Sequence, residues 1–442
     1  MSPIDEVEEF LALTAERRIS IDSRTASRGD VFLAIEGERV DGNDYIQQAF
    51  ERGVDFAYSS KKSSDVRIRR VESIETLLVE SARRLLASSN VKKRIAITGS
   101  NGKTTTKEIA AFLLAKLGRV FKTEGNLNTE IGLPLSLLNG RAELEGADFG
   151  VFEVGTNQKG DIRKLTKLLD PQLCVLLNVG TAHLGNFNSP DELLEEKLSI
   201  FDSPSIDFAI MNGDDARIKN FARSFNGEVR FFGINGRDFA LKNFSYDEKT
   251  TLAHFDSQGD RFVKLKGFWN IGQIIDFGAA YLVSRTCGLE EPALVISEFT
   301  LPYSDRFGVQ RLKGITLICD LYNSSLESWQ SAISSIDRLN CRRKIAVTGS
   351  ILEQGIHSGT THLKLGHLLD YFDEVAFFNP DREIERAGEV ITPSIVTDDP
   401  SRLALWLKNY VRGGDLVFFK ASRGVALERV FARFLELMKD AE

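Results

Sequence analysis

The stretch RIAITGSNGKTTTKE, which begins at Arg94, constrains the fold of this chain more than any other feature. An apolar run ends at Thr98, a glycine-containing turn follows, and a segment with a helical pattern continues from Lys103. Glycines allow successive N–H groups and the positive end of a helix to converge on one point, which suits a phosphate. The predicted phosphate-binding residues are Gly99, Ser100, Asn101, Gly102, Lys103, Thr104 and Thr105.

The spacing of this turn differs from the common phosphate loop, G-x-x-x-x-G-K-[ST]. Ile97 occupies the position of the first glycine, and the chain instead reads T-G-x-x-G-K-T. We expect Lys103 to reach the terminal phosphates of a nucleotide and the Thr104 hydroxyl to bind Mg²⁺. The alternative, a glycine-rich turn with a chance lysine, is disfavoured by the strand before the turn and the helix after it.

The first residues of this stretch return as KIAVTGS from Lys344. There Gly349 and Ser350 lead into Ile351, Leu352 and Glu353, without a lysine. Two occurrences so far apart are not a solenoid repeat. We therefore predict two similar strand-turn-helix units, of which only the first binds a triphosphate.

Chain length and the pattern of apolar runs predict several domains. A chain of 442 residues is too long for one core of ordinary size. From Arg94 onward, apolar runs alternate with helical segments, which is typical of a mostly parallel sheet covered on both faces. The sequence predicts an α/β protein with three domains, at residues 1–90, 91–300 and 301–442, and a mostly parallel central sheet.

Composition indicates a folded protein of the cytoplasm. Apolar residues make up 42% and charged residues 27% of the chain, as in soluble globular domains, and the net charge of -7 disfavours nucleic-acid binding. The acidic N-terminus MSPIDEVEEF is unlike a secretion signal, and no apolar run is long enough for a membrane span. We expect a cytoplasmic monomer that binds neither nucleic acid nor membrane. The cysteines expected to be buried, reduced thiols are Cys174, Cys287, Cys319 and Cys341.

The variant phosphate loop resembles that of the Mur ligase family, ATP-dependent enzymes that add amino acids to the peptide of bacterial cell-wall precursors. The stretch GNLNTEIGLPLSLL from Gly125 is similar to G-N-x-N-x-x-I-G-x-P, a signature of the branch that adds D-alanyl-D-alanine. EVGTNQKGDI from Glu153 resembles E-x-G-x-N-x-x-G-E-I, with Asp161 in place of Glu. The first signature makes Asn126 and Asn128 candidates for substrate binding. Further family motifs follow in order across nearly the whole chain.

The resemblance implies a role for each predicted domain. The first is a small α/β domain that binds a UDP-sugar, the second is a P-loop ATPase-like domain, and the third is a Rossmann-like α/β domain. In the first, IDSRTASRGDVFLAIEG and DGNDY resemble the uridine-nucleotide module, with Ser23 and Arg24 as candidates for contact with the UDP-sugar.

Three residues are candidates for metal binding in addition to Thr104. Glu153 ends an apolar strand, and ligands collect at the carboxyl ends of the strands in such sheets. His183 follows CVLLNVGTA and is expected at the same edge; a lone histidine is more often structural, but the resemblance favours a ligand. Lys197 in ELLEEKLSIF would by sequence alone be a solvated partner of neighbouring acids. The resemblance instead implies a lysine that CO₂ converts to a carbamate, which helps to hold a second Mg²⁺. The implied catalytic residues are Lys103, Glu153, His183 and Lys197.

The adenine site is implied by GFWNIGQ from Gly267, which resembles G-x-H-N-x-x-N. Asn270 is retained, whereas Trp269 replaces the histidine and Gln273 replaces the second asparagine. The resemblance therefore implies adenine contact through Asn270.

The last domain supplies further nucleotide contacts. SDRF places Arg306 where the family has a Gly-Arg that reaches the ATP phosphates. ICDLYNSS is similar to D-x-Y-N-x-N, which implies that Asp320 binds the ribose and that Tyr322 and Asn323 lie near the nucleotide. Ser325 replaces the final asparagine of that motif.

Two more stretches of this domain resemble family motifs. TGSILEQG from Thr348 is similar to G-D-M-A-E-L-G and implies a structural role or a contact with the incoming substrate; His362 follows at the family's spacing. KASR resembles a K-G-S-R segment near the incoming amino substrate, and a cationic pair there could hold a carboxylate. The candidates in this segment are Lys420, Ser422 and Arg423.

The resemblance implies an ATP-dependent ligase that joins D-Ala-D-Ala to a UDP-N-acetylmuramoyl-tripeptide through an acyl phosphate, with ATP and two Mg²⁺ ions. Arg306 and Asp320 lie outside the central domain, so we expect the third domain to close onto the second when ligands bind. The alternatives are a sister Mur ligase, a folylpolyglutamate-type ligase, or a non-catalytic nucleotide-binding switch. The Gly125 signature and the segments that resemble the uridine-nucleotide module disfavour the first two, and a switch has no use for Glu153, His183 and Lys197 together.

Overall fold

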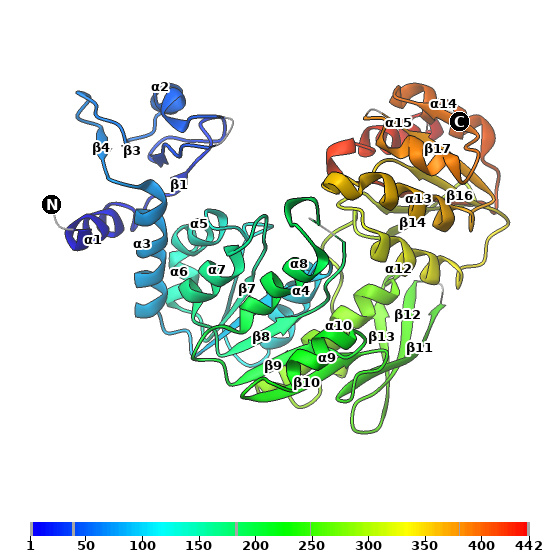
Figure 1. Ribbon diagram of the computed structural model, residues 1–442, viewed down its shortest axis with the longest axis horizontal. Helices are drawn as coiled ribbons and strands as arrows, with labels where there is room; N and C mark the ends of the chain where they lie inside the picture. Colours follow the sequence, from blue (N-terminus) through cyan, green and yellow to red (C-terminus); the bar gives the residue numbers. More distant parts are fainter. Residues whose placement is uncertain (1–2, 38–39, 182–183, 248, 380, 440–442) are drawn as a thin grey trace.

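The computed structural model describes residues 3–37, 40–181, 184–247, 249–379 and 381–439, with the side chains of residues 3–5 left out. Within these residues the chain forms three sheets that follow each other along the sequence (Figure 1). The prediction of a three-domain α/β protein is therefore confirmed. The first and third domains lie at opposite ends of the central one (Figure 1).

The first domain has a parallel sheet in the order β1-β2-β3-β4. The strands are β1 (Ile19–Ser20), β2 (Val31–Leu33), β3 (Phe56–Ser59) and β4 (Ile68–Arg70). The helices are α1 (Pro3–Leu13), α2 (Ile46–Glu51) and α3 (Ile74–Ser88). Ser73 caps α3 by accepting a hydrogen bond from the Thr76 N–H. Although α3 lies within the predicted first domain, it packs against α5, α6 and α7 of the central domain and so joins the two cores.

The central sheet has the order β13-β12-β11-β10-β9-β8-β5-β7-β6. Its strands are β5 (Lys93–Thr98), β6 (Val120–Lys122), β7 (Phe149–Glu153), β8 (Leu173–Leu176), β9 (Phe208–Asn212), β10 (Glu228–Gly233), β11 (Phe239–Asp247), β12 (Thr250–Asp256) and β13 (Asp260–Lys266). The pairs from β6 to β11 are parallel, and β12 and β13 extend the sheet antiparallel. The predicted mostly parallel sheet is present.

Helices cover both faces of this sheet. They are α4 (Lys103–Leu114), α5 (Gly132–Asn139), α6 (Arg141–Glu145), α7 (Asp161–Leu169), α8 (Pro190–Leu198), α9 (Ala216–Ala222), α10 (Ile271–Thr286) and α11 (Pro292–Ile296). Strand β5 is buried on both faces, because Ile95 and Ile97 join the core formed with α4 and α10 while Ala96 joins the opposite core with α5 and α7. This double burial explains why the strand is apolar without alternation.

The third domain has the sheet order β14-β15-β19-β16-β17-β18, in which only the pair of β14 and β15 is antiparallel among the described strands. The strands are β14 (Gly308–Leu312), β15 (Ile315–Asp320), β16 (Lys344–Thr348), β17 (Glu374–Phe378), β18 (Ile395–Thr397) and β19 (Leu416–Lys420). The helices are α12 (Leu326–Ile336), α13 (Ser358–Leu369), α14 (Pro400–Tyr410) and α15 (Glu428–Lys439).

The two similar stretches of sequence are two interior strands. β16 lies between β19 and β17, as β5 lies between β8 and β7. After β16, however, the chain passes through a loop and a short 3-10 segment (Gly355–His357) before α13 begins. The two stretches are therefore similar because both form buried strands. Only the first leads directly into a helix.

The expectation for the cysteines is partly wrong. All four are free thiols, but only Cys174 and Cys319 are buried, whereas Cys287 and Cys341 are half-buried. Across the described ranges, no helix has the length and apolar character needed to cross a membrane.

Candidate active site

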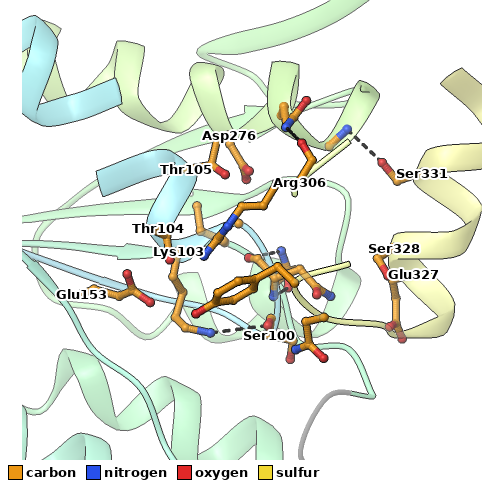
Figure 2. Close-up of a pocket in the computed structure, with 18 of the residues that line it drawn as sticks. Ser100, Lys103, Thr104, Thr105, Glu153, Asp276, Arg306, Glu327, Ser328 and Ser331 are labelled. Carbon is orange, nitrogen blue, oxygen red and sulfur yellow. Dashed lines mark hydrogen bonds between the residues drawn. The ribbon is translucent and has the colours of Figure 1, made fainter. Parts of the chain in front are cut away.

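The phosphate loop lines a cavity of about 490 Å³ between the central and third domains (Figure 2). Most of the residues predicted for the site line this cavity. They are Ser100, Asn101, Gly102, Lys103, Thr104, Thr105, Asn126, Asn128, Glu153, Lys197, Asn270, Arg306, Asp320, Tyr322, Asn323 and Lys420. Residues from distant parts of the sequence thus meet in one place.

The loop joins the end of β5 to the start of α4. Gly102 adopts a left-handed conformation with φ of 86°, and a Cβ atom there would lie 2.1 Å from Oδ1 of Asp276. Both facts require glycine. In the part of the chain that the structure describes, no side chain caps the N-terminus of α4, so its first N–H groups remain available to an anion.

Lys103 lies along its own loop. Its Nζ donates hydrogen bonds to the carbonyl oxygens of Gly99 at 2.8 Å and Ser100 at 3.4 Å. Burial lowers the pKa of this ammonium group, and the nearby Glu153 opposes that effect. A bound phosphate would offer the ammonium group a stronger, charged acceptor than these carbonyls.

Glu153 ends β7 at the carboxyl edge of the sheet, as predicted, and is 2% exposed. Its Oε1 accepts a hydrogen bond from Asn128 Nδ2 at 2.7 Å. Its Oε2 accepts no hydrogen bond from the described residues, and the Nζ of Lys107 lies 3.6 Å away. This buried oxygen has no hydrogen-bond donor, and Glu153 lines the same cavity as Thr104, so these two residues fit a divalent cation.

Lys197 lies near the end of α8 and is 1% exposed. The solvated surface position that sequence alone favours is therefore wrong. Burial lowers the pKa of Lys197 to about 7, Lys103 acts in the same direction, and Glu196 opposes them. Glu196 accepts hydrogen bonds from the N–H groups of Gly160 and Ile162 at the start of α7. His183 lies outside the described residues.

Trp269 and Gln273, the two residues that differ from the family motif at the start of α10, have structural roles. Trp269 is fully buried, and its Nε1 donates to the Lys266 carbonyl at 2.8 Å. Asn270 and Gln273 form a reciprocal cap in which each side chain accepts the other's backbone N–H at 2.9 Å. The Nε2 of Gln273 also donates to the Arg306 carbonyl at 2.9 Å. Gln273 thus links α10 by a hydrogen bond to the segment that carries Arg306.

The third domain contributes one stacked cation and one ion pair to the cavity. The guanidinium of Arg306 lies 3.8 Å from the ring centre of Tyr322. Lys420 Nζ donates to Asp320 Oδ2 at 2.6 Å and to the Asn323 carbonyl at 2.9 Å. The charge of Lys420 is thus already paired with Asp320.

Lys420 and Arg423, the predicted cationic pair, have different partners in this structure. Arg423 instead lies over the Tyr322 ring at 5.6 Å. Ser422 accepts a hydrogen bond from the Leu352 N–H at 3.0 Å. Of this segment's three candidates, only Lys420 is among the described residues that line the cavity.

Helix α12 connects the two domains at the cavity. Glu327 accepts hydrogen bonds from the Thr181 N–H at 3.0 Å and the Thr181 hydroxyl at 3.1 Å. Asn101 of the phosphate loop donates to Ser325, which also caps α12. The domains are therefore already in contact in this structure, and a further closure on ligand binding stays a prediction.

The remaining candidates lie away from the cavity. In the first domain, Ser23 donates to Gln48 at 2.6 Å, and the exposed Arg24 pairs with Asp22. After β16, the buried His362 accepts a hydrogen bond from the Ile351 N–H at 3.0 Å. The interactions of His362 favour the structural role for this second loop.

Among the described residues in or beside this cavity, sequence reasoning missed three charged ones: Lys107, Asp276 and Glu327. Lys107 lies one helical turn after Lys103, so helical periodicity could have placed it beside the loop. Asp276 is a lone acid in the apolar run of α10, which is itself a signal. Glu327 has no sequence signal, because its role depends on the contact between domains.

Comparison with known proteins agrees with this geometry. Three family models match in chain order: Mur ligase family, catalytic domain, at residues 17–92; Mur ligase middle domain at 97–270; and Mur ligase, glutamate ligase domain, at 305–423. The UDP-N-acetylmuramoyl-tripeptide–D-alanyl-D-alanine ligase of Treponema pallidum is 30% identical over 432 residues, which cover 93% of this chain and 92% of that protein. The chain belongs to the Mur ligase family.

Further relatives of this Mur ligase belong to the branch that adds D-alanyl-D-alanine. The Bacillus subtilis ligase of the same name is 29% identical over 437 residues, which cover 95% of this chain and 93% of that protein. The crystal structure of the MurF ligase from Thermotoga maritima in complex with ADP has a TM-score of 0.88 and 36% identity, covering 97% of this chain and 99% of that one. The branch predicted from the Gly125 signature is confirmed.

Proposed function

We propose that this Mur ligase uses ATP to join D-Ala-D-Ala to a UDP-N-acetylmuramoyl-tripeptide in the synthesis of peptidoglycan precursors. The observation that carries this proposal is the cavity between two domains, in which Lys103, Glu153 and Lys197 face Arg306 and Asp320. The names of its relatives and the ADP complex of the Thermotoga maritima protein support it. We place the reaction in the cytoplasm and expect the enzyme to act as a monomer.

The nucleotide is proposed to bind with its phosphates at the N-terminus of α4. The free N–H groups there and the two cations Lys103 and Arg306 would offset the phosphate charge. Asn270, which lines the same cavity at the start of α10, is proposed to contact the adenine. Asp320 is proposed to accept hydrogen bonds from the ribose hydroxyls, and its ion pair with Lys420 would hold it in place.

We propose that Mg²⁺ binds at two positions. Glu153 Oε2 and the Thr104 hydroxyl would hold one ion, and Lys197, as a carbamate with His183, would help to hold the other. A buried lysine with a pKa of about 7 is partly neutral near neutral pH, and only a neutral amine reacts with CO₂. The proposed ligands include a hydroxyl and a carbamate, and in the described ranges no three His, Cys, Asp or Glu side chains cluster as a metal site. When bound, Mg²⁺ supplies charge neutralisation for the phosphates.

The proposed reaction has two steps. The γ-phosphate of ATP passes to the free carboxylate of the tripeptide, forming an acyl phosphate and ADP. The amine of D-Ala-D-Ala then attacks the acyl carbon, the amide bond forms, and inorganic phosphate leaves with the electrons of the broken C–O bond while the amine loses a proton. The side chains contribute alignment and charge neutralisation, which is what phosphoryl transfer requires of a protein.

The other two substrates are proposed to approach from opposite sides. The UDP-sugar would bind the first domain through Ser23 and Arg24, and its peptide would reach the cavity beside Asn126 and Asn128. D-Ala-D-Ala would approach from the third domain. The residues proposed to face it are Tyr322, Asn323, Lys420, Ser422 and Arg423.

The decisive experiment measures phosphate release from ATP with each substrate left out in turn. We expect release only when the UDP-tripeptide and D-Ala-D-Ala are both present. Tripeptides with lysine or meso-diaminopimelate at the third position would then define the preferred substrate. Hydrolysis without either substrate, or none with both, would exclude the ligase and favour a nucleotide-binding switch.

A further inference from the structure

Asp276 is a buried acid in the nucleotide cavity that forms no hydrogen bond or ion pair with the described residues. It lies in the second turn of α10, is 7% exposed and lines the cavity. Its side chain lies beside the phosphate loop and next to Thr105 (Figure 2). Its two carboxyl oxygens lie within 2.7 Å of the position that a Cβ atom on Gly102 would occupy. A buried polar group is usually hydrogen-bonded, so this carboxyl group is available to a ligand.

Two charged groups act on Asp276 from the neighbouring elements: Lys103 at the start of α4 and Arg306 in the segment between the domains. Neither forms an ion pair with it in this structure, because Lys103 donates to the Gly99 carbonyl and Arg306 stacks on Tyr322. Burial raises the pKa of Asp276 to about 7 and outweighs the opposing effect of both cations.

Nucleotide phosphates at the loop would shift the protonation of Asp276 toward the neutral acid. They bring negative charge next to Asp276, and they draw the charges of Lys103 and Arg306 to themselves. Both changes disfavour an ionised carboxylate at this position. A neutral carboxyl group, by contrast, has an O–H that can donate to a phosphate oxygen.

We propose that Asp276 receives the nucleotide as a neutral acid and donates a hydrogen bond to one of its phosphate oxygens. Where Asp276 is ionised beforehand, nucleotide binding takes up one proton from solution onto its carboxylate. This inference rests on the proposed nucleotide site and adds that nucleotide affinity falls above neutral pH. It also gives the clash at position 102 a functional meaning, since any side chain there would displace the acid.

Calorimetry with ADP tests this directly, without turnover. The wild-type protein and Asp276→Asn are titrated at pH 6 and pH 8, each in two buffers of different ionisation enthalpy. Asn has the shape of Asp and is always a neutral donor, so it mimics the proposed state. Because ADP and Lys197 also titrate, the measured quantity is the difference between the two proteins, which share those groups.

With a pKa of about 7 before binding, the wild-type protein should lose about tenfold in affinity between pH 6 and pH 8 relative to Asp276→Asn. At pH 8 it should take up about 0.9 more protons per ADP bound than the variant does. Asp276→Ala should bind more weakly than Asp276→Asn at both pH values, because alanine has no donor. Asp202→Asn is the matched control, since Asp202 pairs with Arg163 on the surface, and it should behave like the wild type.

Two results would overturn the inference while leaving the nucleotide site in place. One is equal pH dependence and equal proton uptake in the wild type and Asp276→Asn. The other is a loss of affinity in Asp276→Asn at both pH values, which would mean that Asp276 acts as an anion. If the wild-type protein does not bind ADP at all, the proposed function fails together with the inference. If Asp276→Asn does not fold, the same difference between the wild type and Asp276→Ala keeps the test decisive, because alanine also lacks the titrating carboxyl group.

Discussion

Changing Lys107 to Met should destabilise the central domain by about 3–5 kcal/mol, because it breaks a buried ionic network. Lys107 is fully buried, and its Nζ donates to the carbonyl oxygens of Thr123 and Gly125 at 2.8 Å. The same atom lies 3.5 Å from Glu108 Oε1 and 3.6 Å from Glu153 Oε2. Methionine fills a similar volume, so the cost comes from two carbonyls and the buried carboxylate of Glu153, which lose their cation, whereas Glu108 keeps its ion pair with Lys122.

Lys122→Met is the matched control. Lys122 pairs with the same carboxylate, Glu108, but its side chain is 45% exposed. An exposed ion pair contributes about 0.2–1 kcal/mol. In a domain of this size each kcal/mol shifts the melting temperature by about 2–4 °C, so Lys107→Met should melt roughly 6–20 °C below the wild type and Lys122→Met within about 4 °C of it.

Differential scanning calorimetry of both variants measures this difference, and steady-state kinetics add a second readout. Because Lys107 also fixes the position of Glu153, the kcat of a folded Lys107→Met protein should fall while the KM for the UDP-tripeptide stays near that of the wild type. If Lys107→Met melts within 2 °C of Lys122→Met, the buried network does not hold the domain together and the reasoning is refuted.

Two further changes test the proposed site. Lys103→Ala should remove ATP turnover but leave the affinity for the UDP-tripeptide largely intact, because that substrate is proposed to bind the first domain; calorimetry that shows both lost would contradict it. Lys197→Ala should nearly abolish turnover, and added short-chain carboxylates should partly restore it by occupying the place of the carbamate, whereas normal activity would exclude that role. Since the pKa of Lys197 is lowered to about 7, wild-type activity should fall as pH drops below 7, where the protonated amine no longer reacts with CO₂; a pH–rate profile checks this.

Local features of this protein follow from the sequence. The turn from Thr98 to Lys103 needs only short-range backbone geometry, and its glycines and the strand before it can be read directly. The position of Glu153 follows from one general rule, that the carboxyl ends of parallel strands share an edge. Strands such as β5 and β16 are recognisable because burial on both faces requires an unbroken apolar run.

Burial and charge pairing were decided only by the tertiary structure. Lys197, surrounded by acids in the sequence, is buried where α8 packs against α7, and Lys420 is paired because β19 lies beside β15. Asp276 meets Gly102 only because α10 crosses α4. A side chain's environment depends on residues far away in the chain, and short-range patterns carry no information about which of them converge. The sequence by itself determined the loop, the strands and the family motifs, and the packing of the domains determined which charges face one another.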